Sequence, residues 1–377
     1  MDAVFWRSII GVRFAYLGYP LSLMLIAFFR QRRVKRTPIE PSVTLIITAH
    51  NEEKGIESKI LNTLKLDYPR DRMEIIVASD GSTDRTNDIV RHYVQQEGVK
   101  LLAFDKRRGK EFAQKDAVAS AKGDVLVFTD VATQLRASGL REIVNNFSDP
   151  SVGCVSSEDR LERSDGQTAG EGFYVRYEML LRRLETRAHS LVGLSGSFFA
   201  ARKEVCSDFS ADMQSDFKTL LNSIRLGLRG VSDVDALGYY LDVADQKKEL
   251  ERKIRTIIRG LTVFFQHLEL LNVFRYGLFS YQLFCHKLLR WLVPLFLFTA
   301  LMSNLVLAFG SGAYFSIFLL QVMFYALAAI TLLKKDPPNH LLLKIPGYFL
   351  SVNLAIAIAW WRYLSGYRVL MWTPSER

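Results

Sequence analysis

Polar side chains that can bind a nucleotide or a cation follow three apolar runs of the chain. Asn51 and Glu52 come directly after one run, Asp80 after the next, and Asp130 closes a third. An amide or carboxylate can accept hydrogen bonds from a base or ribose, and carboxylate oxygen is what a hard divalent cation prefers. The alternative for Asn51 and Glu52 is a helix N-cap with an acidic first turn, and a capped turn explains the glycine and hydroxyls after Asp80.

Positive charge enters at Lys110, which follows Gly109 at the start of a predicted helix. A cation beside a helix N-terminus suits an anionic diphosphate, because the helix dipole and the first N–H groups also favour negative charge. A solvated basic loop is the alternative. At Asp130 a divalent cation can bridge the carboxylate and the diphosphate and neutralise a leaving group.

The elements around these residues predict an α/β fold. Strands are expected at Val43–Thr48, Glu74–Ser79, Val99–Phe104 and Val125–Thr129, and helices at Glu52–Leu66, Asp84–Gln96 and Lys110–Ala121. Short strands that alternate with helices indicate a doubly wound, mainly parallel sheet. Ligands bind such sheets at the carboxyl ends of the strands, where these polar motifs fall.

Long apolar segments flank this region and indicate a membrane protein. Ile9–Phe29 is long enough to span a bilayer and is followed by the basic flank Arg30–Arg36. The flank favours an uncleaved anchor over a signal peptide and places the next domain in the cytoplasm. Three later segments are each long enough to cross: Leu288–Phe309, Ala313–Leu333 and Leu341–Trp361. Three crossings would leave Arg362 and Arg368 outside, so one of these segments is re-entrant in the alternative topology.

Charged residues interrupt the apolar stretch Arg252–Lys287, which therefore reads as amphipathic interfacial helices. The expected organisation is an anchor with its basic flank (1–36), a cytoplasmic catalytic domain (37–250), interfacial helices (251–287) and a C-terminal transmembrane region with a tail (288–377). The net charge of +10 suits contact with anionic lipid, and no nucleic-acid partner is expected because the dense Lys/Arg cluster is juxtamembrane. The isolated Cys154, Cys206 and Cys285 read as buried small hydrophobes.

The order of the motifs resembles the membrane-bound family 2 inverting glycosyltransferases of the GT-A fold, of the exopolysaccharide and cell-surface glycan type. The resemblance rests on Thr48–Glu53, Ser79–Asp84, Phe128–Asp130 and Ser215–Phe217, and it extends to Trp372–Pro374 in the tail.

The resemblance implies roles for single residues. Asp80 would contact the nucleoside, Asp130 would bind Mg²⁺ or Mn²⁺, and Asp216 would be the general base that takes the proton of the acceptor hydroxyl. Arg255 would lie near the donor diphosphate. An N-cap is the alternative for Asp216, and a basic helix on the lipid surface is the alternative for Arg255.

The chain departs from the family pattern at three places. Ala132 replaces the second acid of the Asp-x-Asp motif, and Ser215 replaces the acid before the base. Around Arg255, Arg252 and Thr256 stand where processive synthases carry Gln and Trp. These departures put the metal and long-chain processivity in doubt and keep an inactive regulatory module open.

The expected function is transfer of a sugar from a nucleotide-diphosphate donor, a UDP-sugar in the first instance, to a lipid-linked or polysaccharide acceptor. The chain would be a multi-pass protein of the cell (inner) membrane with its catalytic domain in the cytoplasm. Its partners would be the donor, the acceptor, the lipid bilayer and polysaccharide-assembly proteins. A polyprenyl-phosphate sugar synthase and a processive polysaccharide synthase are the alternative enzymes.

Overall fold

The computed structural model describes residues 1–162, 173–241, 246–333 and 341–369, which form two compact units. The sheet unit holds residues 23–241 and 263–279, and the helical unit holds residues 1–22, 246–262, 280–333 and 341–368. The tail motif Trp372–Pro374 lies outside the described residues.

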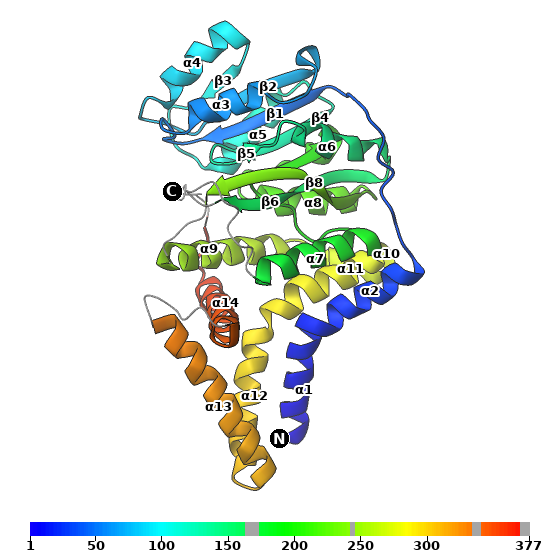
Figure 1. Cartoon of the computed structure of the whole chain (residues 1–377), viewed down its shortest axis with the longest axis vertical. Helices are drawn as coiled ribbons and strands as arrows, with labels where there is room; N and C mark the ends of the chain where they lie inside the picture. The colour runs from blue at the N-terminus through cyan, green and yellow to red at the C-terminus, as the bar shows by residue number, and fades with distance from the viewer. Residues whose placement is uncertain (163–172, 242–245, 334–340, 370–377) are drawn as a thin grey trace. The chain divides into compact units, whose positions relative to one another are not determined.

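The sheet unit contains an eight-stranded sheet within the described residues, drawn in Figure 1. Its strands are β1 Val43–Ala49, β2 Met73–Ser79, β3 Lys100–Ala103, β4 Val125–Asp130, β5 Gln134–Leu135, β6 Val152–Glu162, β7 Phe198–Arg202 and β8 Arg229–Leu241. Its helices are α3 Ile56–Leu64, α4 Thr86–Glu97, α5 Lys110–Ser120, α6 Gly139–Asn145, α7 Phe173–Ala188, α8 Ser215–Arg225 and α10 Val273–Tyr276. Short 3₁₀ turns are η2 Arg70–Arg72, η3 Asn146–Ser148, η4 Lys203–Cys206 and η5 Leu268–Leu271.

The strand order is β3-β2-β1-β4-β7-β6-β8-β5. Strands β3, β2, β1 and β4 are parallel, β7 is antiparallel to both of its neighbours, and β6 pairs with β8 in parallel. The predicted doubly wound, GT-A-like sheet is confirmed. Its second half is mixed, because β7 and β5 run against their partners.

Helices cover both faces of the sheet. Side chains of α3, α4 and α6 pack with one face, and side chains of α5, α8 and η4 pack with the other. Strand β1 is buried along its whole length, which explains its continuous apolar run. From β1 the chain winds outward to β2 and β3, and α5 then returns it to β4 on the other side of β1. The strand order therefore reverses between β1 and β4, which is where open α/β sheets bind ligands.

The helical unit contains α1 Asp2–Arg13, the π-helical turn η1 Phe14–Gly18, α9 Gln246–Phe265, α11 Leu278–Leu283, the π-helical turn η6 Phe284–Leu289, α12 Val293–Ala308, α13 Gly312–Leu333 and α14 Leu341–Leu364. Helix α2 Tyr19–Phe29 continues η1, and α2, α9 and α11 each extend past a unit boundary. Helices α1 and α12 pack closely: Ser8 Oγ lies 2.8 Å from Thr299 Oγ1, and a Cβ on Gly11 would come within 2.9 Å of the Phe296 ring.

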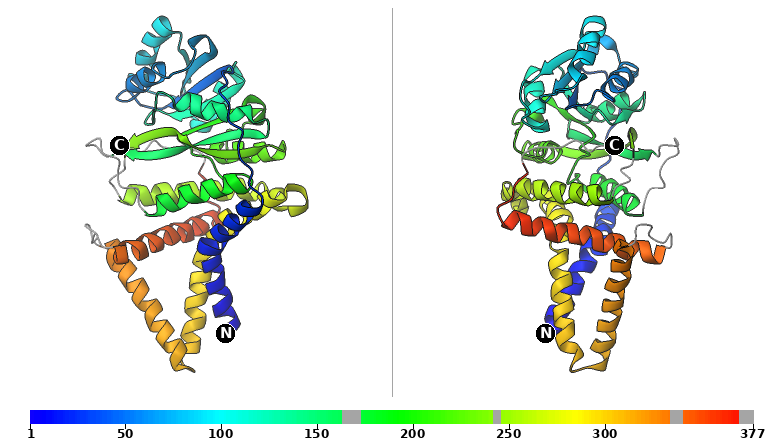
Figure 2. Two further views of the ribbon diagram at one scale, coloured as in Figure 1. Left: turned by 45° about the vertical axis from the view of Figure 1, so that its right-hand side comes forward. Right: turned by 90° about the vertical axis from the view of Figure 1, so that its left-hand side faces the viewer.

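Two helices among the described residues are long and apolar enough to cross a membrane, namely Asp2–Phe29 and Gly312–Thr331. The bent pair Leu278–Leu289 and Val293–Ala308, with 56° between its halves, would be a third if it forms one span. Helix α14, which covers the predicted crossing Leu341–Trp361, is not among them, and Figure 2 shows it running across α12 and α13. Polar and charged residues dilute the apolar run of α14, and the number of C-terminal crossings stays a prediction.

On α9, buried Ile254, Ile258 and Leu261 repeat at the spacing of one helix face. The predicted amphipathic character is therefore confirmed, while an interfacial location stays a prediction. Cys154, Cys206 and Cys285 are buried and free, as expected. Burial raises the pKa of Cys154 to about 12.

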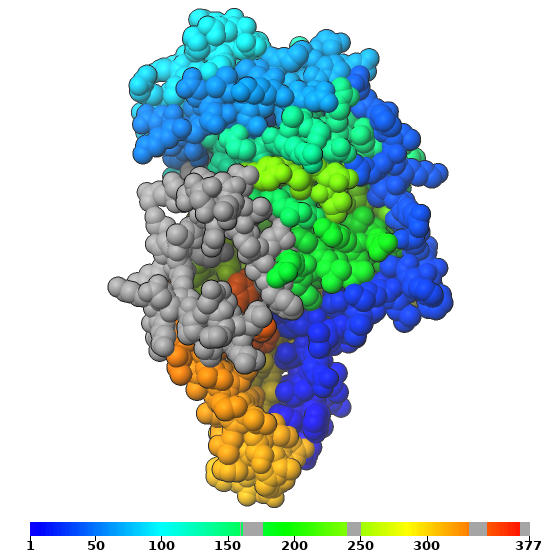
Figure 3. All heavy atoms as spheres, viewed as in Figure 1, coloured from blue at the N-terminus to red at the C-terminus, as the bar shows by residue number. Residues whose placement is uncertain are grey.

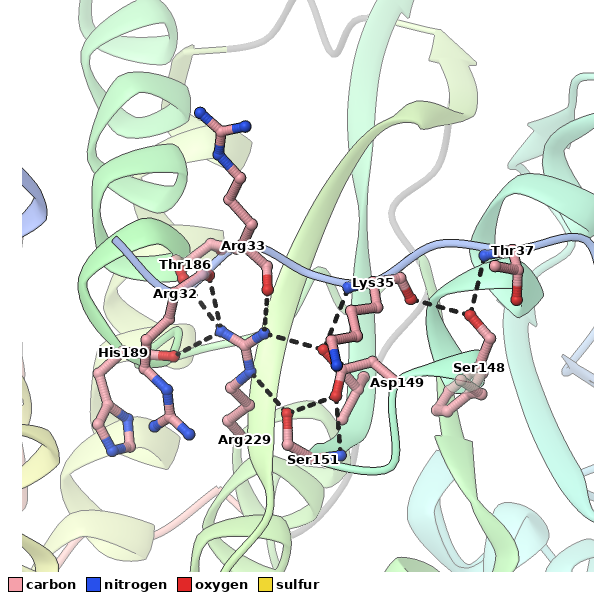
Figure 4. A network of polar contacts seen from close by, with 12 residues as sticks. Arg32, Arg33, Lys35, Thr37, Ser148, Asp149, Ser151, Thr186, His189 and Arg229 are labelled. Atoms are coloured by element: carbon pink, nitrogen blue, oxygen red, sulfur yellow. Dashed lines mark hydrogen bonds and ion pairs between the residues drawn. The ribbon is translucent and has the colours of Figure 1, made fainter. Parts of the chain in front are cut away.

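A buried arginine fastens the basic flank to the sheet unit (Figure 4). The guanidinium of Arg229, at the start of β8, is 3% exposed and donates to the backbone carbonyls of Arg32 and Arg33 at 3.1 and 3.3 Å. It also contacts Asp149 Oδ2 at 3.3 Å and Ser151 Oγ at 3.2 Å. Burial opposes ionisation of Asp149, but bonds from Ser151 and from backbone N–H groups, with the charge of Arg229, outweigh it and hold its pKa below the ordinary value.

Further bonds continue this attachment along the flank. The Lys35 N–H donates to Asp149 Oδ2 at 3.2 Å, and the Thr37 N–H donates to Ser148 Oγ at 3.0 Å. Arg36 pairs with Asp233, whose side chain is 1% exposed. In the space-filling view the blue flank lies against the edge of the sheet unit (Figure 3). The segment between the first apolar helix and β1 is therefore part of the folded domain.

Replacing Arg229 with Met should release this segment. Backbone carbonyls and a buried carboxylate would lose their donor, so we expect the free energy of unfolding to fall by about 3 kcal/mol. Trypsin should then cut faster after Arg32 to Arg36. Denaturant titration and limited trypsin digestion of the detergent-purified chain measure both effects.

The matched control is Arg91→Met, which removes an exposed arginine from α4. We expect the control to change stability by no more than about 0.5 kcal/mol. Equal trypsin sensitivity of the flank in wild type and Arg229→Met would contradict the assignment.

Candidate active site

The predicted site residues of the sheet unit lie where the topology expects a ligand. Asn51 follows β1, Asp80 follows β2, Asp130 ends β4, and Thr48 pairs with Asp130 in the β1–β4 register. Lys110 begins α5, the helix that returns the chain across β1.

Asn51 joins two loops and does not cap a helix. Its side-chain Oδ1 accepts a hydrogen bond from the Thr83 N–H at 2.8 Å, and its own N–H donates to Ser82 Oγ at 3.1 Å. Its φ of 53° lies in the left-handed region, which Asn tolerates better than most residues. Helix α3 begins at Ile56 with Gly55 as its N-cap, so the predicted start at Glu52 was four residues too early.

Glu52 is half-buried beside this junction. Its N–H donates to Thr86 Oγ1 at 2.8 Å, and its carbonyl accepts from Gly55 and Ile56 in the turn before α3. The backbone of Glu52 is therefore held by the α4 start and by its own turn. Contact of its carboxylate with a base or ribose stays a prediction.

Asp80 holds the backbone of the loop that leads into α5. Its carboxylate accepts from the Arg108 N–H at 2.7 Å and from the Gly109 N–H at 2.8 Å, and the residue is 3% exposed. Gly81 makes this approach possible: its φ is 62°, and a Cβ there would lie 2.4 Å from the Arg107 nitrogen. The sequence missed this positioning role, since it depends on a contact with residues nearly thirty positions away. The predicted nucleoside contact of Asp80 stays a prediction.

Lys110 connects the end of β4 to the loop that contains Gly196. Its ammonium forms an ion pair with Asp130 Oδ1 at 2.5 Å and donates to the Gly196 carbonyl at 3.2 Å. The lysine is 7% exposed, and the side chain of Asp130 is 24% exposed. The sequence predicted separate roles for Lys110 and Asp130, whereas the structure pairs them.

Asp216 lies close to Gly196, the residue whose carbonyl binds Lys110. A Cβ on Gly196 would come within 3.3 Å of Asp216 Oδ2, so the glycine lets the carboxylate approach the loop. The amide of Gln214, the N-cap residue of α8, donates to Asp216 Oδ2 at 3.1 Å. Asp216 is therefore in the first turn of α8 and not its cap. Gln214 is a neighbour of Asp216 that sequence reasoning missed.

A second lysine lies under the turn that follows β4. Lys59 on α3 is fully buried, and its amine donates to Thr129 Oγ1 at 2.9 Å and to the Thr133 carbonyl. Burial lowers the pKa of Lys59 to about 7, against the attraction of Asp130. The signal for this contact was in the sequence, because Ile56, Lys59 and Ile60 share one helix face and place a lysine on the apolar side.

The residues around Asp130 fit a divalent cation poorly. In the part of the chain that the structure describes, no three His, Cys, Asp or Glu side chains gather closely enough to hold a metal ion. Asp130 is the one acid of the motif, Ala132 adds no oxygen, and one carboxylate oxygen already binds the Lys110 ammonium. The protein therefore offers a cation one carboxylate that is already shared with an ammonium, and the other oxygen ligands would have to come from the diphosphate and water.

Arg255 lies on α9 and belongs to the helical unit, whereas the residues described above belong to the sheet unit. Burial and the neighbouring Arg259 and Arg252 lower its pKa. Its predicted role at the donor diphosphate stays a prediction. The structure pairs Lys110 with Asp130, lets Asp80 hold the backbone just before Lys110, and places Asp216 close to Gly196, whose carbonyl binds Lys110.

Comparison with known proteins agrees with this geometry. Residues 44–209 match the model of glycosyl transferase family 2. A stretch of 195 residues, 50% of this chain, is 26% identical to poly-beta-1,6-N-acetyl-D-glucosamine synthase of Staphylococcus aureus strain COL and covers 46% of that protein. The chain thus spans about half the length of the curated relatives that it matches.

A solved structure extends the likeness of fold to nearly the whole chain. The mannosyltransferase PcManGT from Pyrobaculum calidifontis, in complex with GDP-Man and Mn²⁺, superposes with a TM-score of 0.76 at 21% identity. The match covers 97% of this chain and 99% of that one. The family match over residues 44–209 and the sheet topology together show a glycosyltransferase domain of family 2, with the GT-A fold, in this part of the chain.

Proposed function

We propose that this chain is a membrane-bound inverting glycosyltransferase that moves a sugar from a nucleoside-diphosphate donor to an acceptor hydroxyl. The carrying observation is that Lys110 binds both Asp130 and the Gly196 carbonyl, while Asp216 lies close to the same Gly196. A cation at the expected diphosphate position and a carboxylate thus share one neighbourhood. A leaving-group stabiliser and a general base are the two groups that a single displacement needs.

Each group then has a defined task. Asp216 takes the proton of the acceptor hydroxyl as its oxygen attacks the anomeric carbon, and Gln214 keeps the carboxylate oriented through Oδ2. The Lys110 ammonium donates to the diphosphate oxygens as the bond to the sugar breaks. Asp80 fixes the Arg108–Gly109 backbone, so that the N-terminus of α5 faces the phosphates.

The donor that we propose is a UDP-sugar, and the acceptor is a lipid-linked or growing polysaccharide chain at the cytoplasmic face of the cell membrane. The similarity to a poly-N-acetylglucosamine synthase supports a glycan product, and the apolar helices support a membrane location. Because Gln and Trp are absent around Arg255, transfer of one or a few sugars is favoured over synthesis of a long polymer.

Purified protein in detergent, incubated with labelled UDP-N-acetylglucosamine, UDP-glucose or GDP-mannose and a defined lipid-linked saccharide, tests the proposal. Release of nucleoside diphosphate with a short extension of the saccharide is expected. Transfer to bare polyprenyl phosphate would identify a sugar-carrier synthase, and a ladder of high mass would identify a processive synthase. Binding of nucleotide without any transfer would leave the inactive regulatory module.

Replacing Asp216 with Asn should remove transfer and leave donor binding intact. An amide cannot accept the hydroxyl proton, so we expect the rate to fall by about 10²- to 10⁴-fold. The turnover rate with the best donor checks the loss of transfer, and the dissociation constant of that donor checks that binding is retained. Asp212→Asn, which changes an exposed acid four residues away, is the control and should keep full activity. Wild-type turnover in Asp216→Asn would refute the base assignment.

Replacing Asp80 with Asn should loosen the loop before Lys110. An amide offers one acceptor oxygen, so one of the two N–H groups that Asp80 now binds would face an NH₂ donor. We expect the free energy of unfolding to drop by about 1–3 kcal/mol and UDP binding to weaken by about tenfold. Denaturant titration and calorimetry measure these effects, with the exposed Asp105→Asn as control. Unchanged UDP affinity would show that Asp80 does not shape the donor site.

A further inference from the structure

Lysine amines donate hydrogen bonds to oxygen atoms of the turn where the sequence predicts a divalent cation. Asp130 Oδ1 binds the ammonium of Lys110, while Thr129 Oγ1 and the Thr133 carbonyl bind the amine of Lys59. The Asp130 carbonyl accepts the Thr133 N–H at 3.1 Å. A cation bound at Asp130 Oδ1 would have to compete with the Lys110 ammonium.

The sequence adds no replacement ligand at the turn. Ala132 stands where the family pattern has its second acid, so no second carboxylate enters from this position. Mg²⁺ is usually held by one or two carboxylates together with substrate phosphates and water, and here the one carboxylate of the motif is shared with an ammonium. A positively charged lysine held 2.5 Å from that carboxylate also repels a divalent ion.

The same arrangement suits the diphosphate itself. Lys110 begins α5, an 11-residue helix whose first N–H groups and dipole favour an anion. The lysine is held in place by Asp130 and by the Gly196 carbonyl. Lys59 donates hydrogen bonds to two points of the turn in either protonation state, because a neutral amine also carries N–H donors.

We propose that lysines replace the divalent cation in this chain: Lys110 neutralises the donor diphosphate, and Lys59 is a positioning residue that braces the Asp130 turn. This inference rests on the proposed function and specifies how its leaving group is stabilised. As the acceptor oxygen bonds to the anomeric carbon, the bond from that carbon to the diphosphate oxygen breaks. The electron pair stays on the diphosphate, which Lys110 contacts, and the hydroxyl proton goes to Asp216.

Calorimetric binding of UDP and GDP tests this directly, in excess EDTA and in Mg²⁺ or Mn²⁺. For wild type we expect the affinity for the better nucleotide to agree within about twofold between conditions, well under the tenfold that 1.4 kcal/mol represents. Lys110→Met should weaken diphosphate binding by about 10- to 100-fold, as loss of a charge-assisted hydrogen bond implies. Binding of the uncharged nucleoside should stay unchanged in that variant, which a folding defect would not allow.

A double variant tests the role of Lys59. Lys59→Met with Ala132→Asp removes the brace and restores the second acid, so we expect UDP binding that Mn²⁺ strengthens, with Lys110 keeping the remaining affinity in EDTA. Lys65→Met, which removes an exposed lysine just after α3, is the control and should bind like wild type in both conditions. Double-variant binding that ignores metal would overturn the assignment of Lys59.

Outcomes for wild type separate this inference from the proposed function. Nucleotide binding that EDTA abolishes and Mg²⁺ or Mn²⁺ restores would overturn the lysine replacement and leave a metal-dependent glycosyltransferase. Absence of UDP and GDP binding in every condition would overturn the proposed function, and the inference with it.

Discussion

The ion pair between Lys110 and Asp130 is the contact on which the candidate site depends. Lys110 is nearly buried, and an ammonium withdrawn from water is costly unless a carboxylate and further acceptors surround it. Asp130 supplies the charge and the Gly196 carbonyl supplies a second acceptor. The pair thereby fixes the end of β4, the start of α5 and the loop beside Asp216 with respect to one another.

Other parts of the site support this pair from outside. Asp80 fixes the backbone immediately before Lys110, and Asn51 ties the loop after β1 to the loop after β2. Each of these bonds joins two loops that are distant in the sequence but follow neighbouring strands or lead into the next helix. Each loop is therefore shaped by its neighbour in the sheet. A site assembled in this way is pre-organised, which lowers the cost of orienting a donor when it binds.

The departures from the family pattern form a consistent set. Gln214 donates to Asp216 through a neutral amide, so orienting the proposed base adds no charge beside it. At the other departure, Ala132, lysine amines occupy the oxygen atoms of the turn. In both places a hydrogen-bond donor contacts residues next to the missing acid: Gln214 lies beside Ser215, and Lys59 binds Thr133 next to Ala132. The Arg229 network shows the same use of buried basic side chains, since it binds backbone carbonyls of the flank that precedes β1.

Sequence patterns alone determined the strands β1 to β4, the helices between them and the edge of the sheet where the polar motifs gather. These features follow from apolar runs, turn residues and the right-handed connection of parallel strands, which act over short stretches of chain. The start of α3 was less well predicted, because Asn51 adopts a left-handed conformation and the helix begins only at Ile56. Tertiary structure alone decided that Lys110 pairs with Asp130, that Lys59 is buried beneath Thr133, and that Arg229 binds the flank. A charged side chain takes the partner that is available when water is excluded, and residues twenty to two hundred positions apart meet only once the sheet has formed.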